Sequence, residues 1–157
     1  MGSEWFSDHP PVPTDSMLAM VNLDMVGRGG ADDIAGGGPR YLQVIGSDRR
    51  SPALLKVITD LNAASATPAT LVTTDPDGGF CKSDQWSYAR RGIPVAFFTT
   101  GSHADYHSVT DEAAYIDFAK LASVTRFVTA VVARLADTQE RLEPPGKRVV
   151  LPGFCGG

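Results

Sequence analysis

Two stretches of the chain are apolar at nearly every position, which is the pattern of a strand whose two faces are both buried. Residues 17–26 form the first stretch and residues 93–100 the second. Shorter apolar runs at 41–45 and 70–73 predict two further strands. We expect the first stretch to be a central strand of the sheet. A single carboxylate, Asp24, interrupts it near its end.

Apolar residues three or four positions apart predict helices between these strands. The first helix should begin at Ser51-Pro52, a favourable N-cap and first-turn pair, and a short second one should cover residues 83–91. The longest apolar stripe follows Asp117, which suits an N-cap. It consists of Leu121, Val124, Phe127, Val128, Val131 and Leu135. Fully apolar strands that alternate with amphipathic helices indicate an α/β fold in which helices cover both faces of the sheet.

Composition narrows the classes of partner. The chain has 157 residues, the size of one domain, and 14 Lys+Arg against 18 Asp+Glu give it a net charge of -4. Because no basic run is present, neither nucleic acid nor an anionic membrane surface is an expected partner. The apolar runs fall far short of the ~20 residues that cross a bilayer. The two cysteines, Cys81 and Cys155, show no motif spacing, so we expect unpaired thiols.

Asp24 is the first candidate for chemistry. An ionised carboxylate near the end of an apolar strand is costly unless it is paired, hydrogen-bonded or bound to a metal. A capping interaction with nearby backbone N–H groups and a metal ion are both consistent with its position. By contrast, we expect Asp32 and Asp33, which lie in the glycine-rich stretch 29–39, to be solvated in a flexible loop.

His103 and His107 are the next candidates, since an i, i+4 pair on a helix can place two imidazoles on one zinc ion. The preceding strand and Gly101 predict a loop here, where that spacing has no geometric meaning, so we expect at most one ligand. A serine nucleophile is disfavoured because the chain contains no Gly-x-Ser-x-Gly motif. A thiol nucleophile would pair Cys81 with His107, but nothing near Cys81 marks it as reactive.

Three motifs follow one another along the chain. They are Val-Asn-Leu-Asp-Met-Val-Gly at 21–27, Ser-Asp-Gln-Trp-Ser-Tyr-Ala-Arg-Arg-Gly-Ile-Pro-Val at 83–95 and Asp-Tyr-His-Ser-Val-Thr-Asp-Glu at 105–112. In order and spacing they resemble the second half of the co-catalytic zinc aminopeptidase family, which includes bacterial leucyl aminopeptidases and is related to glutaminyl cyclases and the transferrin-receptor ectodomain. The resemblance implies a three-layer α/β/α sandwich with a central, mostly parallel mixed sheet, whose N-terminal part is absent here.

The resemblance also implies roles for three residues. Asp24 and His107 would each ligate one of two zinc ions, and the hydroxyl of Tyr106 would stabilise the oxyanion of the tetrahedral intermediate. Carboxylate and imidazole ligands suit a catalytic zinc that keeps an open position. Because such ions lie ~3.5–4 Å apart, we expect Asp24 and His107 to lie close together, with Tyr106 beside them, where the strands 17–26 and 95–100 end.

The resemblance predicts an incomplete site. The family's first histidine, its bridging aspartate and its two paired glutamates all precede the glycine-serine that this chain has at Gly2-Ser3. Each zinc would therefore find one protein ligand here, and no residue would act as the general base. Lesser departures are Gln85, where a histidine is common, and Ser108-Val109, where threonine-proline is usual. We expect the chain alone to bind zinc weakly and to hydrolyse aminoacyl substrates negligibly.

Two hypotheses follow from these observations. In the first, the chain is the C-terminal half of a secreted or periplasmic aminopeptidase that acts on peptides, with the export signal in an upstream segment. Residues 1–137 would belong to its catalytic domain and 138–157 to a loosely held tail, and the chain would associate with the missing half or with itself. In the second, it is a non-catalytic interaction module or remnant of the same fold. Retention of Asp24, Tyr106 and His107 favours the enzyme.

Overall fold

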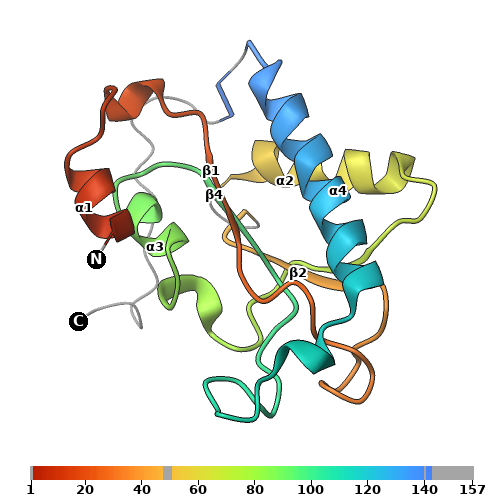
Figure 1. The fold of residues 1–157 in the computed structure, drawn as a ribbon. Helices are drawn as coiled ribbons and strands as arrows, with labels where there is room; N and C mark the ends of the chain where they lie inside the picture. The colour runs from red at the N-terminus through yellow and green to blue at the C-terminus, as the bar shows by residue number, and fades with distance from the viewer. Residues whose placement is uncertain (1, 48–50, 140, 143–157) are drawn as a thin grey trace.

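The centre of the molecule is a mixed sheet of four strands, seen edge-on between helices in Figure 1. The computed structural model describes residues 2–47, 51–139 and 141–142. The strands are β1 (Met20–Leu23), β2 (Tyr41–Ile45), β3 (Thr70–Val72) and β4 (Val95–Thr99), in the spatial order β1-β4-β2-β3. β1 is parallel to β4, β2 is parallel to β3, and β2 is antiparallel to β4. The predicted α/β class is confirmed.

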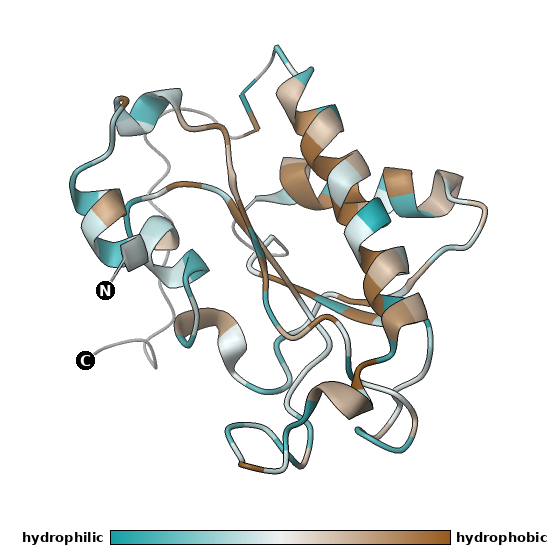
Figure 2. Ribbon diagram, viewed as in Figure 1, coloured by the Kyte–Doolittle hydropathy of each residue, from teal (hydrophilic) through white to brown (hydrophobic). Residues whose placement is uncertain are grey.

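Two long helices cover one face of this sheet, α2 (Pro52–Ala64) and α4 (Phe118–Ala136). The side chain of Asp117 accepts a hydrogen bond from the backbone N–H of Lys120 at 2.9 Å, so it is the N-cap that the sequence predicts. The larger apolar core lies between these helices and the sheet, and the helices and strands that enclose it carry many of the hydrophobic residues coloured brown in Figure 2. Its fully buried members include Leu42, Val44, Leu54, Ile58, Phe98 and Val131.

Shorter elements cover the opposite face. These are α1 (Gly2–Asp8), the 3₁₀ turn η2 (Gly79–Cys81) and α3 (Gln85–Ala89), with α1 packed against α3. A second apolar cluster forms between them and the sheet, composed of Ile45, Phe80, Ala89, Val95 and Phe97. Two further 3₁₀ turns are η1 (Thr14–Ser16) and η3 (Ala113–Tyr115). With helices on both faces, the described chain has three layers.

The two apolar stretches differ in how they enter the sheet. The stretch 93–100 forms β4, which is buried at every position between two neighbours. The stretch 17–26 yields only the four residues of β1, which is an edge strand of the described sheet, and Leu23 is 39% exposed. The prediction of a central strand over 17–26 is therefore wrong within the described residues. Leu18, Ala19 and Val26 still pack against the core, which explains their apolar character without a strand.

Two other expectations concern the cysteines and the tail. Cys81 is disulfide-bonded, so the expectation of unpaired thiols is wrong. The only other cysteine of the sequence, Cys155, lies outside the described residues, as does most of the predicted tail 138–157. Leu142, which the structure does describe, is buried against the larger core. Within the described ranges, no helix is both long and apolar enough to span a bilayer.

Candidate metal centre

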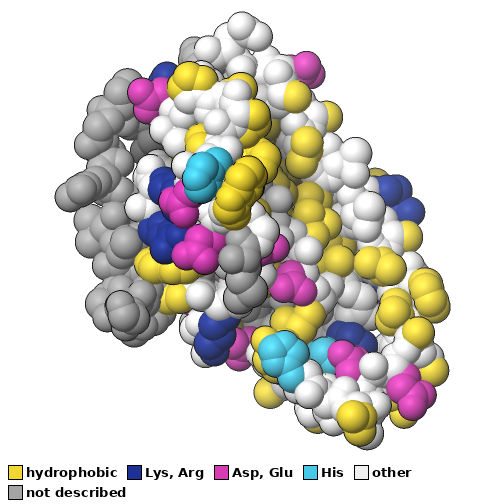
Figure 3. Space-filling model, turned by 60° about the vertical axis from the view of Figure 1, so that its left-hand side comes forward, with side chains coloured by type: hydrophobic (Ala, Val, Ile, Leu, Met, Phe, Trp, Pro, Cys, Tyr) yellow, Lys and Arg dark blue, Asp and Glu magenta, His cyan; other side chains and the backbone are white. Residues whose placement is uncertain are grey.

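The loops that carry the predicted ligands leave the same edge of the sheet. β1 and β4 are parallel neighbours, with Leu23 opposite Phe98, so their carboxyl ends lie together. Asp24 directly follows β1, and its backbone N–H donates to the carbonyl of Phe98 at 3.2 Å. The loop after β4 carries Tyr106 and His107. In Figure 3, histidine side chains gather with acidic and basic side chains at the lower end of the molecule.

The backbone is in the left-handed region at two positions of this edge. Met25 has φ 55° and His107 has φ 58°, and among the described residues no other non-glycine residue has a positive φ. The carbonyl of Met25 accepts hydrogen bonds from the backbone N–H of Thr100, at 3.1 Å, and from the hydroxyl of Thr100. Strained backbone of this kind gathers at functional sites, where the surrounding contacts hold it in place. Here it coincides with one predicted ligand and with the residue after the other.

Asp24 has a partner, but of a kind that the sequence does not predict. Its side chain is exposed, and its Oδ2 accepts a hydrogen bond from the hydroxyl of Ser83 at 2.9 Å. The amide of Asn22 donates to the Ser83 hydroxyl at 3.1 Å and to Oε1 of Gln85 at 3.0 Å. Gln85 is fully buried and donates to two backbone carbonyls of η2. The expected cost of burying Asp24 is therefore absent, because the strand ends before it and its carboxylate faces solvent.

Tyr106 stacks on one predicted ligand and shares a cavity with the other. Its ring stacks on that of His107, with the ring centroids 3.9 Å apart and an angle of 23° between the planes. Tyr106 and Asp24 also line one cavity of about 40 Å³, together with Met25 and Gln43. His107 is exposed and makes no hydrogen bond or ion pair with any described residue. The structure thus brings all three residues to one edge of the sheet, and their chemical roles stay predictions.

His103 also contacts this group, since its ring meets that of Tyr106 edge to face with the centroids 6.5 Å apart. Its side chain is almost fully buried, and its Nε2 lies 3.2 Å from Oδ1 of Asp111 without the alignment of a hydrogen bond. The segment between Gly101 and Glu112 is a loop with turns, as predicted, so the spacing of His103 and His107 does not place them on one helix face. His103 is therefore part of the packing beneath the loop after β4.

Arg28 connects the loops at this edge. Its side chain is 10% exposed and donates to Asp33 at 2.8 Å, to Asp105 at 3.0 Å and to Asp111 at 3.0 Å. Its guanidinium also lies over the ring of Tyr115, 5.3 Å from the centroid. These contacts join the segment after β1, the glycine-rich loop and the loop after β4. We call Arg28, Asp33, Asp105 and Asp111 the Arg28 cluster.

The charges of the Arg28 cluster reinforce one another. Hydrogen bonds from Arg28, together with those from the backbone N–H groups of Gly29 and Gly30, lower the pKa of Asp33 to about 2. The hydrogen bond to Asp33 in turn raises the pKa of Arg28. The hydroxyl of Thr110 and then the guanidinium of Arg28 lower the pKa of Asp105. The expectation that Asp33 is solvated is therefore wrong.

Lys120 anchors the glycine-rich loop from below. Its ammonium group is buried and donates to the carbonyls of Gly29 and Gly38, at 2.9 Å in both cases. Burial lowers the pKa of Lys120. A loop that composition alone predicts to be flexible is thus held at both ends by one side chain of α4.

Sequence reasoning missed the residues that hold the site together. Ser83, Asp105 and Asp111 all lie inside the quoted motifs, and Arg28 follows the first motif directly. A charged residue next to a strand-end motif is a usable signal, but it does not reveal the partners. In the described ranges, no three His, Cys, Asp or Glu side chains are placed to hold one metal ion. The three predicted site residues, Asp24, His107 and Tyr106, supply one carboxylate, one imidazole and one phenol at a shared edge.

Comparisons with known proteins agree with this arrangement. Residues 1–132 match the sequence model of peptidase family M28. Among solved structures, an aminopeptidase from Aneurinibacillus sp. strain AM-1 is 22% identical, with a TM-score of 0.66, over 91% of this chain and 32% of that one. A zinc aminopeptidase from Bacillus subtilis is 21% identical, with a TM-score of 0.67, over 85% and 32%. The LapA aminopeptidase of Legionella pneumophila is 22% identical, with a TM-score of 0.62, over 88% and 36%.

At these identities the structural likeness shows the fold. The chain spans about a third of the length of the solved structures that it matches. No curated protein sequence matches it. The family match and the fold together bear out the resemblance that the three motifs indicate.

Proposed function

The chain belongs to peptidase family M28, and from this premise we propose that it is part of a zinc-dependent exopeptidase that removes residues from the N-termini of peptides. The observation that carries the proposal is the gathering of Asp24, Tyr106 and His107 at one sheet edge. Strand-end loops of an α/β sheet are the usual place for such chemistry. Left-handed backbone at Met25 and His107 supports the proposal, because such backbone gathers at functional sites.

The free atoms at this edge fit a zinc ion in part. Oδ1 of Asp24 makes no hydrogen bond with a described residue, and neither ring nitrogen of His107 does so. A carboxylate oxygen and an imidazole nitrogen are both zinc ligands, and each would supply one bond. Zinc, when bound in such a site, polarises the scissile carbonyl and activates water. Tyr106, stacked on His107, would donate its hydroxyl proton in a hydrogen bond to the developing oxyanion.

We propose that the remaining ligands and the general base come from a segment outside these 157 residues. Two observations support this: the described residues hold no three-ligand group, and the chain spans a third of its structural neighbours. β1 offers a place for that segment, since it is an edge strand of the sheet that the described residues form and Leu23 is partly exposed. Edge strands tend to pair with another strand, so association with the missing half or with a second copy should use β1.

A comparison of a longer protein with residues 1–157 tests this proposal. The reading frame upstream of Met1 is first searched for a histidine, a bridging aspartate and a Glu-Glu pair, and the longer protein is then assayed on aminoacyl p-nitroanilides. We expect zinc-dependent hydrolysis by the longer protein, and weak zinc binding by calorimetry with negligible hydrolysis by residues 1–157. Tyr106→Phe should lower kcat by ~10²–10³ with zinc content unchanged, the usual effect of losing one oxyanion donor. Tight binding of two zinc ions by residues 1–157 alone would contradict the proposal of missing ligands.

A second candidate is a non-catalytic module of the same fold. The coverage of both sheet faces by helices favours it, because the described chain already encloses two apolar clusters of its own. A module of this kind would be monomeric, would unfold cooperatively and would not respond to zinc. If residues 1–157 show these properties and the upstream frame lacks the four ligands, this candidate replaces the peptidase.

The disulfide at Cys81 supports secretion of the protein. Disulfides form and persist in extracellular and periplasmic space and are rare in the cytosol. Alkylation of the denatured protein without a reductant, followed by mass spectrometry, should leave Cys81 unmodified in protein from culture medium or periplasm. Quantitative alkylation of that material would contradict an oxidising destination.

A further inference from the structure

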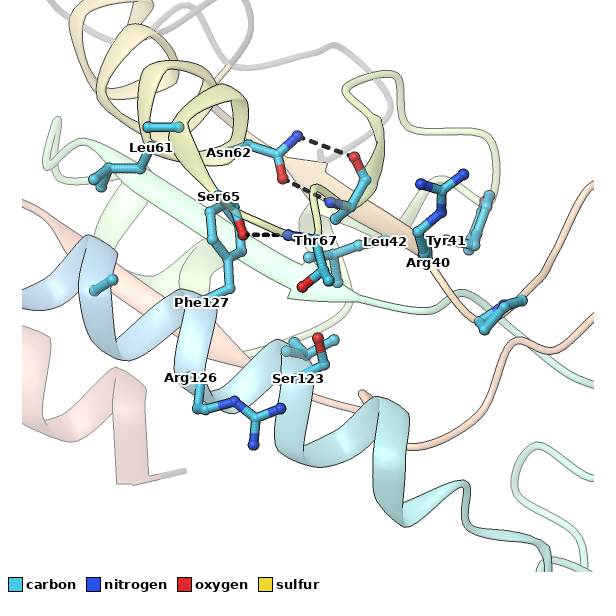
Figure 4. A pocket seen from close by; sticks show the side chains of 15 residues that line it. Arg40, Tyr41, Leu42, Leu61, Asn62, Ser65, Thr67, Ser123, Arg126 and Phe127 are labelled. Atoms are coloured by element: carbon cyan, nitrogen blue, oxygen red, sulfur yellow. Dashed lines mark hydrogen bonds between the residues drawn. The ribbon is translucent and has the colours of Figure 1, made fainter.

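A second cavity lies apart from the candidate metal centre. It is a groove of about 340 Å³ between the end of α2, the start of β2 and the side of α4 that carries Ser123 and Phe127 (Figure 4). This volume is within the range of small-molecule sites. The groove shares no lining residue with the cavity beside Asp24 and Tyr106, so it is not part of the candidate metal centre.

The floor of the groove is apolar and firmly packed. Leu42 and Val124 belong to the larger core, and the partly buried Leu61 and Phe127 pack against it. The ring of Phe127 meets that of Phe98 edge to face, with centroids 6.2 Å apart at 87°. A flat or branched apolar group that enters the groove would therefore meet a surface that is already in place.

One wall of the groove is fixed by hydrogen bonds from side chains to the backbone. Asn62, near the end of α2, accepts a hydrogen bond from the backbone N–H of Ala69 at 2.8 Å and donates to the carbonyl of Ala69 at 3.0 Å. The hydroxyl of Ser65 accepts from the backbone N–H of Thr67 at 3.2 Å. Figure 4 shows these three bonds along the rim. Because the connection from α2 to β3 is fixed in this way, a ligand would not have to order it on binding.

The groove carries positive charge in an acidic protein. Among the described residues that line it, Arg40 and Arg126 are the only ionisable ones apart from Tyr41, and none is a carboxylate, whereas the whole chain has a net charge of -4. They rise from opposite sides, Arg40 from the strand side and Arg126 from α4 (Figure 4). Neither guanidinium makes a hydrogen bond or an ion pair with another residue of the described ranges. The hydroxyls of Thr67 and Ser123 add polar groups between them.

We propose that this groove binds a small organic carboxylate with an aromatic or branched apolar body. The body would cover the floor formed by Leu42 and Phe127, and the carboxylate would receive hydrogen bonds from Arg40 or Arg126 at the rim. Arginine is the side chain best suited to a carboxylate, because its planar fork donates two parallel bonds. Since no acidic residue of the described ranges lines the groove, the ammonium group of a free amino acid finds no oppositely charged partner there. The site therefore discriminates against zwitterions.

The test uses the 157-residue chain and 3-phenylpropanoate as the probe. Titration is followed by ¹H–¹⁵N NMR, with 3-phenylpropanamide and phenylalanine as comparison compounds of nearly the same shape. We expect chemical-shift changes at residues that line the groove. The amide should bind about tenfold more weakly than the acid because it loses one charged hydrogen bond, and phenylalanine should bind about tenfold more weakly because it adds an unpaired charge. Equal affinity for acid and amide, or shift changes confined to other parts of the chain, would overturn the proposal.

Three matched variants separate the site from general charge. Arg40→Gln and Arg126→Gln each remove one positive charge at the rim. At least one of these variants should bind 3-phenylpropanoate about five- to tenfold less tightly than the wild-type chain does. The control is Arg134→Gln, an equal change of charge on the same helix α4 but outside the groove, where Arg134 contacts Thr138. All three positions are exposed, so folding should be retained. Equal affinity of all three variants contradicts the proposed site.

One further pair of probes separates the sources of such a carboxylate. A free acid and the carboxyl-terminal residue of a peptide can both present a carboxylate beside an apolar side chain. N-acetyl-glycyl-phenylalanine serves as the probe for the peptide C-terminus. Tighter binding of this peptide than of 3-phenylpropanoate assigns the groove to peptide C-termini, and weaker binding assigns it to free acids. Failure of both to bind overturns the inference but leaves the proposed peptidase function untouched, since the groove and the metal centre share no residue.

Discussion

Neutralising Asp33 should destabilise the protein in a way that depends on pH. The pKa of Asp33 falls from its ordinary value of 3.8 to about 2 in the folded chain, chiefly through hydrogen bonds from Arg28. At about 1.4 kcal/mol per pKa unit, the ionised carboxylate contributes about 2 kcal/mol at pH 7. Its side chain is 22% exposed, so little of this is lost to solvent screening. We expect Asp33→Asn to lower the free energy of unfolding by about 2 kcal/mol at pH 7.

The sign of the pH dependence follows from the lowered pKa. A carboxylate whose folded pKa lies below its unfolded value stabilises the protein above about pH 5, and this contribution disappears as the pH falls toward 2. The difference between wild type and Asp33→Asn should therefore shrink from about 2 kcal/mol at pH 7 to near zero at pH 2. Urea unfolding followed by tryptophan fluorescence at several pH values measures it.

Asp32 provides the matched control. It is the neighbouring residue with the same side chain, it is exposed, and it makes no hydrogen bond or ion pair with a described residue. Asp32→Asn should change the free energy of unfolding by less than about 0.5 kcal/mol at every pH. Equal effects of the two variants, or an Asp33→Asn effect that stays constant between pH 7 and pH 2, would refute the role assigned to the Arg28 cluster.

Two further substitutions test backbone and core. Gly101→Ala should cost about 2–3 kcal/mol, because φ is 84° and the new Cβ would lie 2.6 Å from Nε2 of Gln43, whereas Gly36→Ala, at φ 78° with open space around it, should cost about 1 kcal/mol. Phe98→Ala should cost about 3–5 kcal/mol at a fully buried core position, and Phe118→Ala, 66% exposed, less than about 0.5 kcal/mol. Chemical denaturation measures both pairs, and a similar loss within either pair would contradict the packing described.

The hydrophobic pattern was sufficient to locate the helices and strands whose own apolar residues pack into the core. The stripe after Asp117 predicts α4, and the structure buries Val124, Val131 and others of that stripe against the sheet. The run 93–100 predicts β4 for the same reason. The run 17–26 misleads, because apolar residues report burial of side chains and say nothing about which backbone groups pair. Coil residues that pack on the core produce the same pattern as a strand.

Contacts between distant residues were beyond the reach of the same reasoning. Arg28 pairs with carboxylates that are 5, 77 and 83 positions away, and no periodicity connects such residues. Asp105 and Asp111 show the consequence most clearly, since they reach Arg28 from the loop after β4. The parallel pairing of β1 and β4 brings the loops that follow these two strands to one edge. Asp33 meets Arg28 within the glycine-rich loop, but composition of that loop predicts a solvated side chain and does not reveal the pair.

The left-handed backbone at Met25 and His107 explains why the motifs alone are insufficient. A side chain with a Cβ resists this region by about 1–2 kcal/mol, so neither residue would hold it without support. At Met25 the support is the pair of hydrogen bonds from Thr100, and at His107 it is the stacked ring of Tyr106 and the loop fixed by Arg28 through Asp105. The orientation of Asp24 and His107 therefore depends on neighbours, and of these only Tyr106 has a proposed chemical role itself. For the same reason, Asp33, which lies outside all three motifs, should influence the edge on which the proposed peptidase depends.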